Sequence, residues 1–176
     1  LHANETLLRL EHTPKLTIAA MNGHTVGGGL EIALACDIRL ASADLRFGFP
    51  IARTLGNCLS IANLSRLVAL IGAGRTKELI FTARLVGAEE ARTIGLVSDV
   101  LPTHESLMTH AKDLAETIAG YAPLTLANTK EALRRLRLDG AGAEDRDLIV
   151  SAYMSADFQE GREAVLAKRK ARWTGR

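Results

Sequence analysis

The stretch that decides the fold is IAAMNGHTVGGGLEIALACDIRLA, residues 18–41. An apolar run meets the turn residues Asn22-Gly23, three glycines follow at 27–29, and Glu31 then opens a segment of strong helix formers. Glycine loses more backbone freedom on folding than any other residue, so three together destabilise the chain unless the backbone needs them. The order of strand, glycines and helix predicts either a loop that brings N–H groups close to a ligand or a tight turn that packs the helix against the strand.

Known phosphate-binding loops do not fit these glycines. A dinucleotide fingerprint needs G-x-G-x-x-G, but its last position, counted from Gly27, is Ile32, and no P-loop lysine follows. What remains is a helix N-terminus whose N–H groups face an oxygen, as in an oxyanion hole. We expect Glu31 in the first turn of that helix, either as a base for enolate chemistry or as a carboxylate that only complements the helix dipole.

The hydrophobic pattern on both sides predicts a mixed α/β fold followed by a helical region. Strands are predicted at 16–21, 37–42 and 96–101, a loop at 47–50, and helices at 4–11, 30–36, 61–71, 75–84 and 87–94. Ile61, Leu64, Val68 and Ile71 form the expected apolar face of the helix at 61–71. Further helices are predicted at 107–122, 123–138, 143–155 and 160–173. We therefore expect two domains, 1–104 and 105–176.

The composition is that of an ordinary soluble protein, with 176 residues of which 47% are apolar and 24% charged. No apolar run approaches the roughly 20 residues of a membrane span, and no secretory leader pattern is seen, so we expect a cytoplasmic protein without a membrane partner. Two cysteines form neither a disulfide framework nor a metal pattern, and no metal is expected.

Positive charge gathers at the C-terminus, where residues 162–176 hold six basic residues and one acidic residue. This segment is interpreted as a solvated last helix whose cations complement its dipole, or as a phosphate-binding or RNA-binding tail. An aromatic content of 4% argues against a stacking platform for single-stranded nucleic acid, which is therefore not an expected partner.

Four segments, in order along the chain, resemble the crotonase superfamily, also called the enoyl-CoA hydratase/isomerase family. They are HTVGGGLEIALACDIRLASADLRFGFP (24–50), GAEEARTIGLVSDVLP (87–102), APLTLANTKEAL (122–133) and DFQEGREAVLAKRKARW (157–173). The resemblance covers residues 16–176. It implies a crotonase-like spiral core of ββα turns, partial here because we expect the N-terminal part to be missing, and a helical C-terminal region that forms homotrimers or hexamers.

The resemblance also implies a site that acts on acyl-CoA thioesters, with no cofactor besides the CoA of the substrate. By motif position, Gly28 matches the glycine whose N–H forms one half of the oxyanion hole, and Glu31 matches the first of two glutamates of the hydratases. Lys168 lies in the segment that reaches CoA in relatives. Ile51 stands where the hydratases carry their second glutamate.

These residues predict an enzyme of the enoyl-CoA hydratase (lyase) or enoyl-CoA isomerase type, active in fatty acid metabolism. With Ile51 at the second position, Glu31 alone would handle the proton, so we expect slow hydration and an easier double-bond isomerisation. The alternative is a catalytically impaired CoA-binding or assembly subunit of the same fold.

Overall fold

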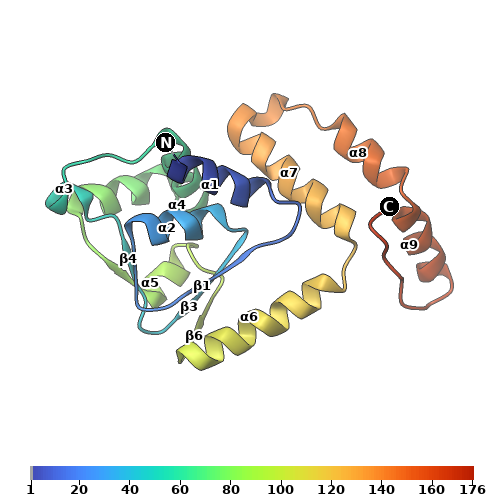
Figure 1. The fold of residues 1–176 in the computed structure, drawn as a ribbon, viewed down its shortest axis with the longest axis horizontal. Coiled ribbons are helices and arrows are strands. Elements are labelled where there is room, and N and C mark those ends of the chain that lie inside the picture. Colours follow the sequence, from blue (N-terminus) through green and yellow to red (C-terminus); the bar gives the residue numbers. More distant parts are fainter. Residues whose placement is uncertain (1) are drawn as a thin grey trace. The chain divides into compact units, whose positions relative to one another are not determined.

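The computed structural model describes residues 2–176, with side chains from residue 5 onward. The chain divides into two units (Figure 1). The first comprises the residues up to His12 and Thr17–Asp113, and the second comprises Thr13–Leu16 and Leu114–Arg176. All six strands belong to the first unit, so the described part of the chain follows the predicted change from mixed structure to helices.

Two small sheets lie in the first unit. In one sheet, β1 (Ile18–Met21), β3 (Ile38–Ser42) and β6 (Asp99–Leu101) run parallel in the order β1-β3-β6. In the other, β2 (His24–Val26) pairs in parallel with β4 (Arg46–Gly48), which pairs antiparallel with β5 (Val86–Gly87). The pairs β1-β2 and β3-β4 each place one strand in each sheet before a helix follows. The chain therefore winds through successive ββα turns.

Helices accompany the sheets in the first unit and make up most of the second unit. The first unit contains α1 (His2–His12), α2 (Gly27–Ala35), α3 (Ile51–Thr54), α4 (Ile61–Thr82), α5 (Ala88–Thr93) and the first part of α6 (His104–Ala119). The second contains the end of α6, α7 (Pro123–Asp139), the 3-10 turn η1 (Gly140–Gly142), α8 (Arg146–Tyr153) and α9 (Ala156–Leu166). No helix in residues 2–176 is both long and apolar enough to cross a membrane.

The core of the first unit lies between α2, α4 and the two sheets. Leu30, Phe47, Leu67 and Leu96 are fully buried there, and burial of such a side chain contributes about 1.5–3 kcal/mol. In Figure 1, α1 lies beside α2, and the two helices are in contact. This core therefore fixes α2, the helix that begins with the three glycines.

Most predicted elements are confirmed, including the strands near 16–21 and 37–42 and the helix capped by Ser60, whose hydroxyl accepts the Asn63 N–H at 3.2 Å. A break is also found between the helices predicted at 61–71 and 75–84, because Gly72 within α4 is non-helical with a φ of 74°. The loop predicted at 47–50 is wrong in part, since Phe47 and Gly48 belong to β4.

The predicted apolar face of the helix at 61–71 is also wrong in part. Ile61 is 82% exposed and Val68 is exposed too, whereas Asn63, Arg66 and Leu67 are buried. The reason is a long-range ion pair: the Arg66 guanidinium binds the Glu11 carboxylate of α1 at 2.7 Å and the Asn63 side-chain oxygen at 2.8 Å. This polar contact turns α4 so that an arginine faces inward.

The helix predicted at 160–173 ends early, at Leu166. The basic segment after it is therefore not a solvated helix. Lys168 has a left-handed backbone with a φ of 50°, which reverses the chain, and residues 170–176 form no helix. The cations at the C-terminus thus lie on an irregular segment.

Candidate active site

The glycines form the start of α2 instead of a loop before it. Val26 is extended, Gly27 has a positive φ of 53°, and the helix begins at Gly27. The first four N–H groups of a helix have no acceptor within it, so the N–H of Gly28 has no hydrogen-bond acceptor within α2. A Cβ placed at Gly28 or Gly29 would meet nothing within 4 Å, so the space beside this backbone is open.

Glu31 lies one turn further along α2 than predicted, because the helix already includes the glycines. Residues three apart in a helix share a face, so Gly28 and Glu31 lie on the same side of α2. The Glu31 side chain is partly exposed, and no other group among residues 5–176 forms a hydrogen bond or ion pair with it. Its carboxylate therefore has no partner in this part of the chain.

A buried arginine holds the other end of α2. The Arg39 Nε atom donates to the Leu96 carbonyl at 2.9 Å, and its Nη1 atom donates to the Cys36 carbonyl, just past the end of α2, at 2.7 Å. A weaker bond reaches the Ala33 carbonyl within α2 at 3.4 Å. Burial lowers the pKa of the Arg39 guanidinium, although the nearby Cys36 and Asp37 oppose this shift. Arg39 thus links α2 to the chain leading into β6.

The structure places Ile51, at the expected second glutamate position, at the start of α3. Its side chain is only 8% exposed and belongs to the core cluster of the first unit. An isoleucine has no acid or base function, and here it packs with apolar neighbours. Residue 51 therefore contributes packing, and of the two positions considered only residue 31 carries a carboxylate.

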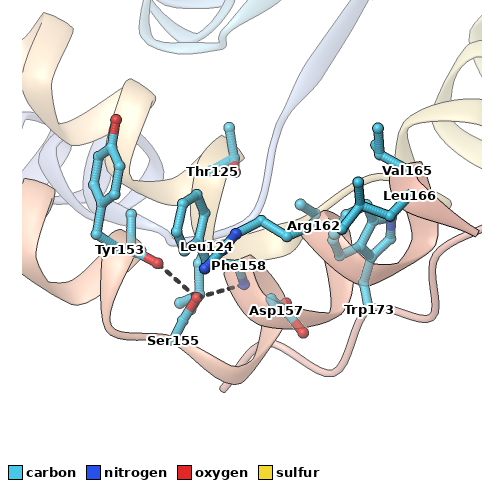
Figure 2. Close-up of a pocket in the computed structure, with 13 residues that line it drawn as sticks. Leu124, Thr125, Tyr153, Ser155, Asp157, Phe158, Arg162, Val165, Leu166 and Trp173 are labelled. Carbon is cyan, nitrogen blue, oxygen red and sulfur yellow. Dashed lines mark hydrogen bonds between the residues drawn. The ribbon is translucent and has the colours of Figure 1, made fainter.

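Lys168 belongs to the second unit, whereas Gly28 and Glu31 belong to the first. The structure therefore brings Gly28 and Glu31 together on one helix and presents Lys168 separately, two residues after the end of α9. Figure 2 shows a pocket of about 780 Å³ in the second unit, lined in part by Leu124, Tyr153, Phe158, Arg162 and Trp173. None of the three predicted site residues lines it.

One carboxylate of α9 that the sequence analysis did not single out, Glu160, binds the chain on the far side of Lys168. The Glu160 carboxylate accepts two hydrogen bonds from Arg169, at 2.6 and 2.8 Å, and one from the Arg172 N–H at 2.8 Å. Arg169 above all, and then the Arg172 N–H, lower the pKa of Glu160 to about 2. The spacing from Glu160 to Arg169 crosses a chain reversal, so no helical or strand period could reveal it.

Comparison with known proteins relates this chain to one protein family. The family model for enoyl-CoA hydratase/isomerase matches residues 2–176. A short-chain-enoyl-CoA hydratase of Clostridium acetobutylicum is 39% identical over 170 residues, which are 95% of this chain and 64% of that protein. The 2,3-dehydroadipyl-CoA hydratase of Escherichia coli is 35% identical over 96% of this chain and 66% of its own length.

Solved structures agree with the sequence relatives. A putative enoyl-CoA hydratase/isomerase family protein from Hyphomonas neptunium superposes with a TM-score of 0.88 at 33% identity, over 98% of this chain and 66% of that one. An enoyl-CoA hydratase from Bacillus anthracis gives 0.86 at 34% identity, over 99% and 68%. The chain thus spans just under two thirds of the length of several of its relatives and has the crotonase fold. It belongs to the enoyl-CoA hydratase/isomerase family.

Proposed function

We propose that the protein is an acyl-CoA-processing enzyme of the enoyl-CoA hydratase/isomerase type, in which Gly28 and Glu31 act together on a thioester. The observation that carries the proposal is the placement of an N–H donor and an unpaired carboxylate three residues apart on one helix face. Relatives named as enoyl-CoA hydratases support acyl-CoA as the substrate class.

In this proposal, the Gly28 N–H donates a hydrogen bond to the thioester oxygen as negative charge develops there. Donors that are fixed before the reaction stabilise such an oxyanion without reorganisation. The N-terminal end of the α2 dipole favours the same charge. The role of Gly28 is therefore to lower the barrier to the enolate.

Glu31 would move the proton. For isomerisation of a 3-enoyl thioester, the carboxylate takes a proton from C2, and the C–H electron pair delocalises onto the thioester oxygen as the dienolate forms. The proton then returns at C4, which leaves the double bond between C2 and C3. One base suffices for both transfers, because the carboxylic acid formed in the first transfer donates in the second.

Hydration of a 2-enoyl thioester would require Glu31 to carry out more steps than isomerisation does. Water must be activated for attack at C3 while C2 receives a proton, and two carboxylates share this work more easily than one. Because residue 51 is a buried isoleucine, Glu31 would hold the water and handle the proton alone. We therefore expect isomerisation to be faster than hydration.

The experiment is turnover of 2-enoyl-CoA and 3-enoyl-CoA thioesters by the protein, its Glu31→Gln variant and a Glu89→Gln control. Glu89 is an exposed glutamate of α5, so its loss should leave turnover within about twofold. Glu31→Gln should reduce both activities by about 10²–10⁴-fold. Equal turnover by both variants would refute the role of Glu31, and CoA binding without turnover in the unaltered protein would favour the impaired subunit.

We also propose that the second unit assembles copies of the chain into a trimer or hexamer. Its helices leave large apolar side chains exposed, among them Met154 and Val165 at 78% and Leu166 at 83%. Exposed apolar surface of this kind favours association. Light scattering should give a mass three or six times that of the chain, and a monomer at working concentration would contradict this.

A further inference from the structure

Within residues 5–176, one face of α2 is exposed while the rest of the helix is covered. The helix contacts α1, α4 and strands of both sheets, and four of its nine residues are buried. In contrast, Gly28, Gly29 and Ile32 are exposed. Residues three and four apart in a helix lie side by side, so these three residues form one exposed stripe along α2.

This stripe is apolar. Ile32 is 52% exposed, although isoleucine is among the residue types most often buried. Val26, directly before the glycines, is another exposed apolar residue. The backbone of Gly28 and Gly29 lies between these two residues along the chain, and an added Cβ at either glycine would meet nothing within 4 Å. The glycines therefore lie within a small, open apolar patch.

The direction of side chains in a helix brings Ile32 over Gly28. A helical side chain points back toward the N-terminus, so that it covers the turn before its own Cα. An isoleucine in a helix also has one strongly preferred χ1 rotamer, which keeps its side chain in one place. Ile32 therefore forms a stiff apolar wall beside the Gly28 N–H, and the Glu31 carboxylate lies next to this wall.

The patch fits a small molecule better than a second protein chain. A stable protein interface buries about 800 Å² on each partner, from about 20–30 residues a side. The apolar side chains at this patch are those of Val26 and Ile32, which are far fewer. A short hydrocarbon chain would cover them, and its own removal from water would favour binding.

We propose that Ile32 is a specificity-determining residue that selects an apolar acyl chain by contacting its carbons C2 to C4. The proposal rests on the proposed function, which places the thioester oxygen at the Gly28 N–H and carbons C2 and C4 at Glu31. Positions 31 and 32 are about 100° apart around the helix, so a chain that lies against Glu31 also reaches Ile32. Since the isoleucine side chain has no polar atom, this wall favours hydrocarbon over a polar group at the same place.

The test measures the dissociation constants of acetyl-CoA and butyryl-CoA by calorimetry, because only the second has carbons C3 and C4. The unaltered protein should bind butyryl-CoA about tenfold more tightly than acetyl-CoA, and Ile32→Ala should reduce this ratio about fivefold. Ile32→Val keeps the branched Cβ and should retain most of the ratio. Val68→Ala is the matched control, because Val68 is a branched residue of α4 that is 39% exposed, and it should leave the ratio unchanged.

Ile32→Ala should also leave the urea midpoint of unfolding and the mass from light scattering unchanged, because Ile32 is exposed. A ratio that stays the same in Ile32→Ala would overturn the proposal, even if both esters bound more weakly. A smaller mass for Ile32→Ala would overturn it too, since a second copy of the chain would then cover the patch. Failure of the proposed function looks different: the ratio would still depend on Ile32, but no enoyl-CoA would turn over.

Discussion

Removing the Arg39 side chain should loosen the helix that carries Gly28 and Glu31. In Arg39→Met, the carbonyls of Leu96 and Cys36 lose donors at 2.9 and 2.7 Å, and two weaker bonds of 3.4 Å disappear as well. Hydrogen bonds to a charged group contribute about 1.5–3 kcal/mol each. Part of this is offset because the guanidinium no longer has to be buried. We expect a net loss of about 2–4 kcal/mol in the free energy of unfolding.

Urea unfolding followed by circular dichroism measures this loss, with the m-value checked for constancy. Arg46→Met is the matched control, because Arg46 is exposed and its side chain donates a hydrogen bond, within residues 5–176, only to the Leu45 carbonyl, so the substitution should change the free energy of unfolding by about 0.5 kcal/mol or less. The stability of Arg39→Lys should lie between those of the two methionine variants, because one ammonium group cannot reproduce the several hydrogen bonds of the planar guanidinium group. If Arg39→Met were as stable as the Arg46→Met control, the reasoning about α2 would be refuted.

Three further predictions concern a close contact, the oxyanion donor and the C-terminal segment. Gly48→Ala should destabilise the protein by about 1–3 kcal/mol in urea unfolding, because its Cβ would lie 2.6 Å from the Arg84 carbonyl oxygen, whereas Gly74→Ala meets nothing within 4 Å and should be neutral or stabilising. Gly28→Pro should lower kcat about 10²–10³-fold by deleting the N–H, while Gly28→Ala keeps it; equal kcat for the two variants would contradict the donor role. Glu160 has a lowered pKa of about 2, so the stability it contributes is present above its ordinary value of 4.5 and is lost as the pH falls towards 2. Protonation of Glu160 should release Arg169 and the Arg172 N–H, and the fluorescence of the adjacent Trp173 should change as this happens. An unchanged signal across that pH range would contradict the role of Glu160 in holding this segment.

Local patterns were enough to predict most of the elements around the glycines. The turn at Asn22-Gly23 and the run of helix formers after Gly29 each act within a few residues. The family resemblance added the expected roles of Gly28 and Glu31 and gave meaning to the isoleucine at residue 51. The site prediction therefore depended on short-range signals and on known motifs.

What the sequence could not reveal depends on contacts between distant residues. The inward face of α4 is set by Arg66 binding Glu11, which is 55 positions away. Gly48 needs its missing side chain because the Arg84 carbonyl lies close, and residues 47–48 pair as a strand only with partners elsewhere in the chain. The last helix was predicted too long because Lys168 adopts a left-handed backbone, a conformation that is uncommon for lysine.

The most direct test of the central claim is proton exchange at the thioester in D₂O. If Glu31 transfers the proton while Gly28 stabilises the enolate, the protein should incorporate deuterium at C2 and C4 of a 3-enoyl-CoA as it isomerises. The Glu31→Gln variant should still bind CoA but incorporate deuterium about 10²–10⁴-fold more slowly. Incorporation at an unchanged rate in Glu31→Gln would contradict the account, because another group would then be moving the proton.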